Sequence, residues 1–245
     1  RHAITKASSL HFPVTEIYKN RIIQMGENPK TVINVGALAV ERIAKVKKLS
    51  MDELENRINI PLKEGYLLVT IHPPTQGNID INFFINEIFT ALEKFDSMSI
   101  VMSYANTDPG GKIINKLKTE FCMKNPNKRI IKASLGQDLY ISLLRNASVV
   151  VGNSSSGIIE APITKTPVVN IGNRQDGRII PSNAICVNAE KDKIYSAIKK
   201  MINLDVNKID NHPFGNGDTS KKILKEIKVF SKNFKNTPKK FYDLV

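Results

Sequence analysis

Short apolar runs rich in β-branched residues alternate with longer amphipathic runs over most of this chain. Such alternation is typical of right-handed βαβ units that build a parallel sheet. Residues 149–151 are three consecutive valines, a pattern expected of a strand that is buried on both faces. We therefore expect an α/β fold with a parallel sheet.

Two series of elements are predicted. The first has strands at 9–12 and 32–35 with a helix at 15–25 between them. The second has strands at 67–71, 99–103, 129–132, 148–151, 168–171 and 185–187, with helices at 82–95, 112–123, 137–145, 157–161 and 191–202. Pro162 is expected to follow the helix at 157–161, and a last helix is expected at 219–234.

The first series is too short to bury a core of its own, and the chain begins with Arg1 rather than Met. We expect residues 1–40 to be the C-terminal remnant of a first domain that begins upstream. Residues 41–65 are polar and charged and are interpreted as a linker. Residues 66–211 have the size of a complete α/β domain, and 212–245 form a C-terminal helical segment.

The composition is that of an ordinary globular chain of 245 residues, 41% of them hydrophobic. No run approaches the roughly 18 apolar residues of a membrane span, and the first residues lack the apolar stretch of a signal peptide. Cys122 and Cys186 are the only cysteines and lie in unrelated contexts. They argue for a reducing cytoplasm and against a disulfide framework or a cysteine-ligated metal.

The formal net charge of +13 would admit a nucleic acid, an acidic membrane or an anionic small molecule as partner. Many lysines lie in "KKILKEIKVFSKNFKNTPKK", where Ile223, Ile227, Phe230 and Phe234 recur at helical spacing. The lysines then fill the opposite, solvated face of that helix. The chain has no tryptophan and no RNP, zinc-finger or helix-turn-helix signature, so we expect no nucleic-acid partner and no membrane partner.

A loop of small polar residues, "GNSSSG" at 152–157, joins a predicted buried strand to a predicted helix. Free backbone N–H groups at such a junction suit an anion, although serine and asparagine also cap helices that bind nothing. A capping box that starts at Ser156 would need an acid at 159, where the chain has Ile159. Glu160 then has no routine capping task, and its carboxylate suits sugar hydroxyls. The loop predicts a site for a nucleotide's phosphate and ribose.

Other polar loops follow the neighbouring predicted strands, and ligands of parallel sheets bind at the carboxyl ends of the strands. These loops are "IHPPTQ" (71–76), "YANTDPGG" (104–111), "KASLGQ" (132–137) and "GNRQDGR" (172–178). The two prolines after His72 would stiffen its loop and project it into a cleft, although a lone histidine there can also be structural. We expect these loops to gather at one edge of the sheet.

The segments "RHAITKASSLHFPVTEIYKNRIIQMGE", "NVGALAVERI", "VTIHPPTQ", "GNSSSGIIEAP" and "NIGNRQDGR" occur in this order. Together they resemble the hydrolysing UDP-N-acetylglucosamine 2-epimerase family of sialic-acid and related nonulosonic-acid biosynthesis, over the whole chain. The resemblance implies a GT-B-like fold, with two Rossmann-like domains, the nucleotide held mainly by the second, and a C-terminal helix that crosses back to the first. It implies a UDP-sugar as the partner, no cofactor and no metal.

The resemblance also implies roles for individual residues. Ser154 and Ser155 match positions that bind phosphate, Glu160 matches the ribose-binding acid, and Arg174 and Asn106 match UDP contacts. Arg174 would otherwise cap a sheet end, and Asn106 before Asp-Pro-Gly-Gly also suits a plain turn.

Ser134 matches a position that holds uracil through backbone groups. His72 matches a catalytic histidine beside the diphosphate and the reacting sugar. Its "HPPT" context resembles the hydrolysing branch of the family rather than the "HRREN" pattern of the non-hydrolysing branch.

The implied reaction is anti elimination of UDP across C1–C2, followed by water addition that yields N-acetylmannosamine. The carboxylates that remove the C2 proton are expected upstream of Arg1, so the chain alone is expected to be inactive. Two alternatives stay open: a UDP-2,4-diacetamido sugar as substrate, or a nucleotide-binding module without catalysis. Apolar faces meant for the upstream domain would be exposed in this chain, so we also expect a homo-oligomer.

Overall fold

The computed structural model describes residues 2–74, 80–210, 212–233 and 239–243. The chain divides into two compact units, one formed by residues 1–45 together with 212–245 and one by residues 46–211. The domain boundaries inferred from the sequence stay predictions.

The second unit is built on a six-stranded sheet in the order β3-β2-β1-β4-β5-β6, in which every neighbouring pair is parallel. The strands are β1 (Tyr66–Thr70), β2 (Ser99–Ser103), β3 (Arg129–Lys132), β4 (Val149–Gly152), β5 (Val168–Ile171) and β6 (Ala184–Val187). All six strands that the sequence predicts in this region are present. The α/β class is therefore confirmed.

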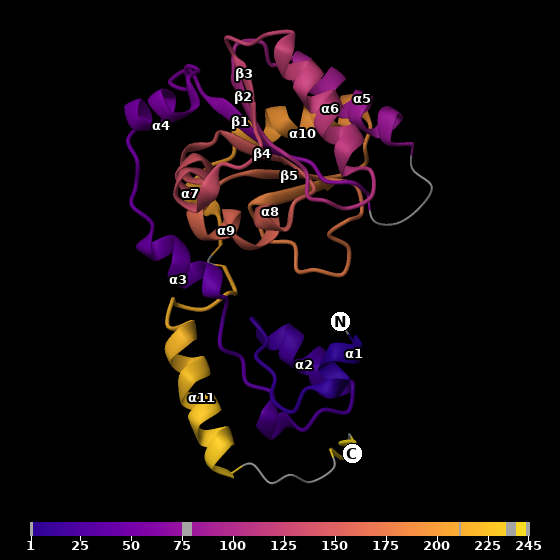
Figure 1. The fold of residues 1–245 in the computed structure, drawn as a ribbon, viewed down its shortest axis with the longest axis vertical. Coiled ribbons are helices and arrows are strands. Elements are labelled where there is room, and N and C mark those ends of the chain that lie inside the picture. The colour runs from indigo at the N-terminus through magenta and orange to yellow at the C-terminus, as the bar shows by residue number, and fades with distance from the viewer. Residues whose placement is uncertain (1, 75–79, 211, 234–238, 244–245) are drawn as a thin grey trace. The chain divides into compact units, whose positions relative to one another are not determined.

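Helices cover both faces of this sheet (Figure 1), with α5, α6 and α10 on one face and α7, α8 and α9 on the other. Their bounds are α4 (Met51–Ile58), α5 (Ile81–Glu93), α6 (Gly111–Met123), α7 (Gly136–Asn146), α8 (Ser155–Ile159), α9 (Ala161–Thr164) and α10 (Lys191–Ile202). The residues of β1 and β4 are all buried, because helices exclude water from both sides of the sheet.

The segment interpreted as a linker is helical. It forms α3 (Leu38–Lys45) in the first unit and α4 in the second. Ser50 and Glu53 form a complete capping box at the start of α4. Leu54 and Ile58 of α4 are fully buried, so this part of the segment belongs to a core.

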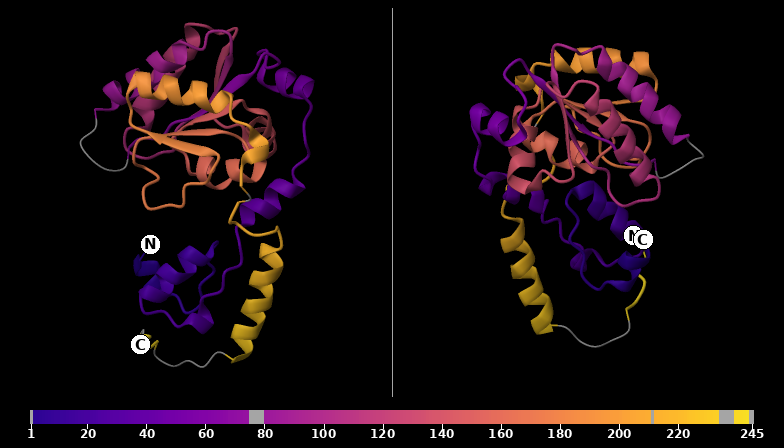
Figure 2. Two further views of the ribbon diagram at one scale, coloured as in Figure 1. Left: turned by 180° about the vertical axis from the view of Figure 1, so that it is seen from behind. Right: turned by 45° about the horizontal axis from the view of Figure 1, so that its top comes forward.

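The first unit contains α1 (His2–Ala7), α2 (Glu16–Gln24), α3 and α11 (Thr219–Asn233), the last two of which Figure 2 shows from two further directions. The Glu41 carboxylate of α3 accepts hydrogen bonds from the backbone N–H and the hydroxyl of Ser220 at the start of α11. On the apolar face predicted for α11, Ile227 is 46% exposed, and Phe234 lies outside the described residues.

A buried carboxylate joins distant segments of this unit. Glu27 is 1% exposed and pairs with Lys6 at 2.8 Å, His11 at 2.9 Å and Lys239 at 2.6 Å. Burial alone would raise the pKa of Glu27, but the hydrogen bonds from Lys239, Lys6 and His11 lower it to about 2. The tail residue Lys239 is thereby attached to the start of the chain.

Two sequence predictions are wrong in detail. Segments 9–12 and 32–35 are not strands, since only a single parallel bridge joins His11 to Val32. Pro13, two residues after His11, has no N–H with which to continue a ladder. The helix predicted at 157–161 lies earlier, as α8 from Ser155 to Ile159. It precedes Pro162 as expected, but Pro162 itself lies in the first turn of a further helix, α9.

None of the helices in the described ranges combines the length and apolar character needed to cross a membrane.

Gly152 ends β4 with φ of +140°, where its Cα lies close to β1. A Cβ atom at this position would come within 2.1 Å of the Thr70 carbonyl oxygen. The absence of a side chain lets the two central strands of the sheet stay paired up to the point where their loops begin.

We predict that Gly152→Ala lowers the free energy of unfolding by about 2 kcal/mol or more, because it adds a backbone clash to an unfavourable φ. The matched control is Gly177→Ala, with φ of +78° and no atom within 4 Å of the added methyl. The control substitution should lower the free energy of unfolding by only about 1–2 kcal/mol, because it places a side chain on a left-handed backbone without a clash. Denaturant unfolding measures the free energy of unfolding of both variants. Equal losses would show that the close approach of Gly152 to the Thr70 carbonyl adds nothing to the destabilisation.

Candidate functional site

The order of the sheet reverses between β1 and β4, because β2 and β3 lie on one side of β1 while β5 and β6 lie beyond β4. Ligands of open parallel sheets bind at such a switch point, outside the carboxyl ends of the strands. The loop that contains His72 follows β1, and the loop that contains the three serines follows β4. These two predicted loops are therefore neighbours at the switch point.

The His72 loop is fixed by the side chain of a residue from the serine loop. The Asn153 amide accepts a hydrogen bond from the His72 N–H at 2.8 Å and donates one to the His72 carbonyl at 2.9 Å. Asn153 is 1% exposed. Its side chain thus replaces the neighbouring strand just beyond the last paired residues, Thr70 and Gly152.

The His72 imidazole accepts a hydrogen bond at Nδ1 from the Asn106 backbone N–H, at 3.1 Å. A neutral ring with Nδ1 as acceptor carries its proton on Nε2. Burial lowers the pKa of His72 to about 4, helped by the positive charges of Arg174 and Lys118 and opposed by Asp108. At neutral pH His72 is therefore an uncharged N–H donor.

Arg174, in the loop after β5, is held by two other loops. Its guanidinium donates to the Asn153 carbonyl at 3.3 Å and lies 3.9 Å from the Asp108 carboxylate. Asp108 also accepts from the Asn106 amide, at 2.5 Å. Five residues therefore form a closed set of contacts, which we call the switch-point ring: His72, Asn106, Asp108, Asn153 and Arg174.

The three serines have different surroundings. Ser154 is the N-cap of α8, and its hydroxyl accepts from the Ser156 N–H at 3.3 Å. Ser156 exchanges a short hydrogen bond with the Tyr140 hydroxyl of α7. Within the part of the chain that the structure describes, the Ser155 hydroxyl has no protein hydrogen-bond partner.

Glu160 lies half-buried where α8 meets α9, one turn beyond the serines. The third residue of α8 after its Ser154 cap is Gly157, so no capping box is present there. Ser134 follows β3 and is exposed, and its hydroxyl accepts from the Gly136 N–H at the start of α7. Since β3 is two strands away from β1, Ser134 lies to one side of the switch point.

The structure thus brings three predicted residues, His72, Asn106 and Arg174, into the switch-point ring, with the serines directly after Asn153. Residues 75 and 76 of the predicted His72 loop lie outside the described residues. Asn153 was overlooked at the sequence level, although it stands between Gly152 and the serines. The signal that could have found it is a single amide directly after a buried strand.

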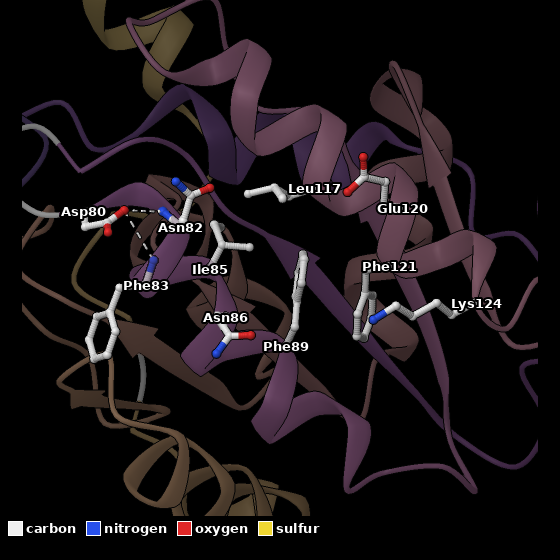
Figure 3. Close-up of a pocket in the computed structure, with 10 residues that line it drawn as sticks. All are labelled: Asp80, Asn82, Phe83, Ile85, Asn86, Phe89, Leu117, Glu120, Phe121 and Lys124. Atoms are coloured by element: carbon white, nitrogen blue, oxygen red, sulfur yellow. Dashed lines mark hydrogen bonds between the residues drawn. The ribbon is translucent and has the colours of Figure 1, made fainter.

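Two of the cavities lined by described residues lie apart from this ring. The larger of these two, of about 510 Å³, lies between α5 and α6 and is lined in part by the stacked rings of Phe89 and Phe121 (Figure 3). The smaller, of about 380 Å³, lies at the ends of β5 and β6 and includes Asn173 and Asp176. Among the described residues, no cluster of three or more His, Cys, Asp or Glu side chains could hold a metal ion.

The chain matches the family model of UDP-N-acetylglucosamine 2-epimerases over residues 1–228. It is 39% identical over 204 residues to the GDP/UDP-N,N'-diacetylbacillosamine 2-epimerase (hydrolyzing) of Campylobacter jejuni, covering 82% of this chain and 52% of that protein. It is 33% identical to the polysialic acid biosynthesis protein P7 of Escherichia coli, over 100% of this chain and 63% of that protein. The chain thus spans about half to two thirds of the length of these relatives.

Among solved structures, the fold resembles the UDP-GlcNAc 2-epimerase of Methanocaldococcus jannaschii in complex with UDP-GlcNAc and UDP. The TM-score is 0.72 at 24% identity, and the match covers 91% of this chain and 61% of that one. Neighbours of this kind have the GT-B-like architecture that the sequence predicts. The chain belongs to the UDP-N-acetylglucosamine 2-epimerase family.

Proposed function

We propose that this chain is the nucleotide-binding part of a hydrolysing 2-epimerase that converts UDP-N-acetylglucosamine to UDP and N-acetylmannosamine. The observation that carries the proposal is the switch-point ring, which holds an uncharged His72 and the Arg174 cation beside the serine loop. Membership in the family supports the reaction class.

The diphosphate would lie where the donors converge. Arg174 supplies positive charge, Ser154 and Ser155 supply hydroxyls, and the Nε2–H of His72 can donate to a phosphate oxygen. The Ser155 hydroxyl, which has no hydrogen-bond partner among the described residues, supports this placement. Because the Asn106 N–H already binds Nδ1, the His72 proton is held on the nitrogen that is left for the substrate.

The ribose and the base would be bound to either side. The half-buried Glu160 carboxylate can accept hydrogen bonds from both ribose hydroxyls. The Ser134 hydroxyl accepts the Gly136 N–H and keeps its own O–H available to donate. By the family resemblance, the uracil would be recognised by backbone groups after β3.

In the proposed reaction a base removes the C2 proton, the electron pair forms the C1–C2 double bond, and the bond from C1 to the UDP oxygen breaks. Water then adds across the double bond to give the free sugar. The residues of this chain stabilise the negative charge that develops on the departing diphosphate. The base is a carboxylate that we expect outside residues 1–245.

A second candidate substrate is a UDP-2,4-diacetamido sugar. The Campylobacter jejuni relative, at 39% identity, is named for N,N'-diacetylbacillosamine, which favours this candidate. Both candidates share the UDP group that the proposed site would bind.

Product analysis tests the function. An enzyme that contains this chain is incubated with each UDP-sugar, and the released sugar and UDP are identified. We expect N-acetylmannosamine from UDP-N-acetylglucosamine, whereas residues 1–245 alone should bind UDP weakly in calorimetry and release none from the sugar nucleotide. Turnover by residues 1–245 alone would place the base within this chain. Exclusive use of the diacetamido sugar would favour the second candidate.

We predict that Ser155→Ala and Glu160→Gln each raise KM and weaken UDP binding, about tenfold or more for the serine. Each removes a hydrogen bond to a part of the substrate that does not react, and a bond to a charged group is worth roughly 1.5–3 kcal/mol. Calorimetric titration with UDP measures the change. The control is Ser97→Ala, an exposed serine between α5 and β2, at the other edge of the sheet. Unchanged affinity in both variants would leave the serine loop with a capping role.

His72→Asn and His72→Gln separate the two ring nitrogens of His72. Asparagine keeps an acceptor near Nδ1 but removes the donor, whereas glutamine can present an N–H near Nε2. We predict that His72→Asn lowers kcat by about 10²–10³ with a smaller effect on UDP affinity, and that His72→Gln retains more activity. Steady-state kinetics checks both variants, and normal turnover of His72→Asn would make His72 a structural residue.

A further inference from the structure

Lys118 is a fully buried lysine in α6 that the proposed chemistry does not use. It lies on the helix face that also carries the buried side chains of Ile114, Phe121 and Cys122. Removing an ammonium from water is unfavourable, and an apolar residue would fill this position at a smaller solvation cost. The contacts of Lys118 must therefore offset its burial.

Those contacts lie at the carboxyl ends of two adjacent strands. The Lys118 Nζ donates to the Ile71 carbonyl at 2.7 Å and to the Ser103 carbonyl at 3.0 Å. The paired residues of β1 and β2 end at Val69 and Met102. Lys118 therefore joins the two strands just beyond their last pair, where the loops of the candidate site begin.

The two carbonyls lie where β1 and β2 pass into the loops that meet in the switch-point ring. Ile71 directly precedes His72, and Ser103 lies three residues before Asn106. A second residue of α6, Asn115, accepts the Ala105 N–H at 2.7 Å. One helix therefore binds the residue before His72 and the residue before Asn106, whose N–H donates to the His72 Nδ1.

We infer that Lys118 is a positioning residue, which joins the ends of β1 and β2 so that His72 accepts the Asn106 N–H and carries its proton on Nε2. The inference rests on the proposed function only in assigning that Nε2–H to the diphosphate. Lys118 acts through the two loops and touches no reacting atom.

The charges around the two groups agree with this arrangement. Burial, Arg174 and Lys118 lower the pKa of His72, while Asp108 raises it. Burial lowers the pKa of Lys118 to about 7, against the influence of Cys122. Loss of the Lys118 charge should therefore raise the pKa of His72.

Long-range ¹H–¹⁵N NMR of the 245-residue chain without nucleotide tests the inference, because ¹⁵N shifts report which imidazole nitrogen is protonated. In the unsubstituted chain we expect the Nε2–H form, with a midpoint near pH 4. Lys118→Met, which keeps most of the length of the side chain but removes its donors, should give a mixture of tautomers and a midpoint above that of the unsubstituted chain, while burial and Arg174 still hold it below the ordinary value. Lys116→Met is the matched control, since Lys116 lies two residues away with its side chain 78% exposed.

If Lys118 had only a structural role, Lys118→Met would lower the melting temperature but leave the His72 tautomer and the midpoint of its titration unchanged. That result would overturn the inference. The unsubstituted chain provides a measurement that needs no folded variant, because the inference requires His72 to accept the Asn106 N–H at Nδ1 and to carry its proton on Nε2. A predominant Nδ1–H tautomer at neutral pH would also overturn the inference.

Turnover and UDP binding separate this inference from the proposed function. In an enzyme that contains the chain, Lys118→Met should lower kcat more than tenfold and UDP affinity less than tenfold. If His72 responds to Lys118 but UDP does not bind, the positioning role holds and the proposed function fails. If UDP binds and His72 ignores Lys118, only the positioning role fails.

Discussion

The pairing of β1 with β4 is the contact on which the candidate site depends. It joins the two halves of the sheet, and it continues to Thr70 and Gly152 because Gly152 has no side chain to strike the Thr70 carbonyl. Beyond this pair, the Asn153 amide satisfies the backbone N–H and carbonyl of His72. His72 thus leaves the sheet with both of its backbone groups paired, and unpaired groups would be costly where water is largely excluded.

The electrostatics of the ring follow from the same geometry. Arg174 is held by the Asn153 carbonyl and by Asp108, so a cation is fixed near His72. Burial of the ring, helped by this cation, lowers the pKa of His72 and keeps it uncharged at neutral pH. A neutral N–H donor gains strength as negative charge develops on its acceptor, and a donor already in position needs no rearrangement during the reaction. These properties suit a site at which an anion departs.

Much of this arrangement is predictable from sequence. Runs of β-branched residues predict the six strands of the sheet, and the polar loops at their carboxyl ends predict where His72, Asn106 and Arg174 lie. The predictions at 9–12 and 32–35 failed because apolar pattern alone does not register that Pro13 interrupts a ladder. The start of α8 was missed because the serines were assigned to the loop, whereas Ser154 caps the helix and Ser155 begins it.

Asn153 and Lys118 escaped prediction for a different reason. Their partners are backbone groups 81 and 47 residues away, and no local pattern marks such pairs. A lysine in an amphipathic helix is expected to face solvent, so only its place in the stripe of Ile114 and Phe121 could have signalled burial. Local sequence predicts which side chains carry the chemistry, but the residues that hold them in place become visible only when the strands are assembled.

Under the proposed function, different residues contact the UDP group and the sugar, and this separation explains how relatives that are named for different sugars can share this fold. The ring and the serine loop offer donors suited to a diphosphate, and Glu160 offers acceptors suited to a ribose, and these groups are common to every UDP-sugar. Under the proposed function, a change at C4 or C6 of the sugar leaves these contacts untouched. Substrate preference could then diverge through residues around the sugar, while the geometry set by β1, β4 and Asn153 stays the same.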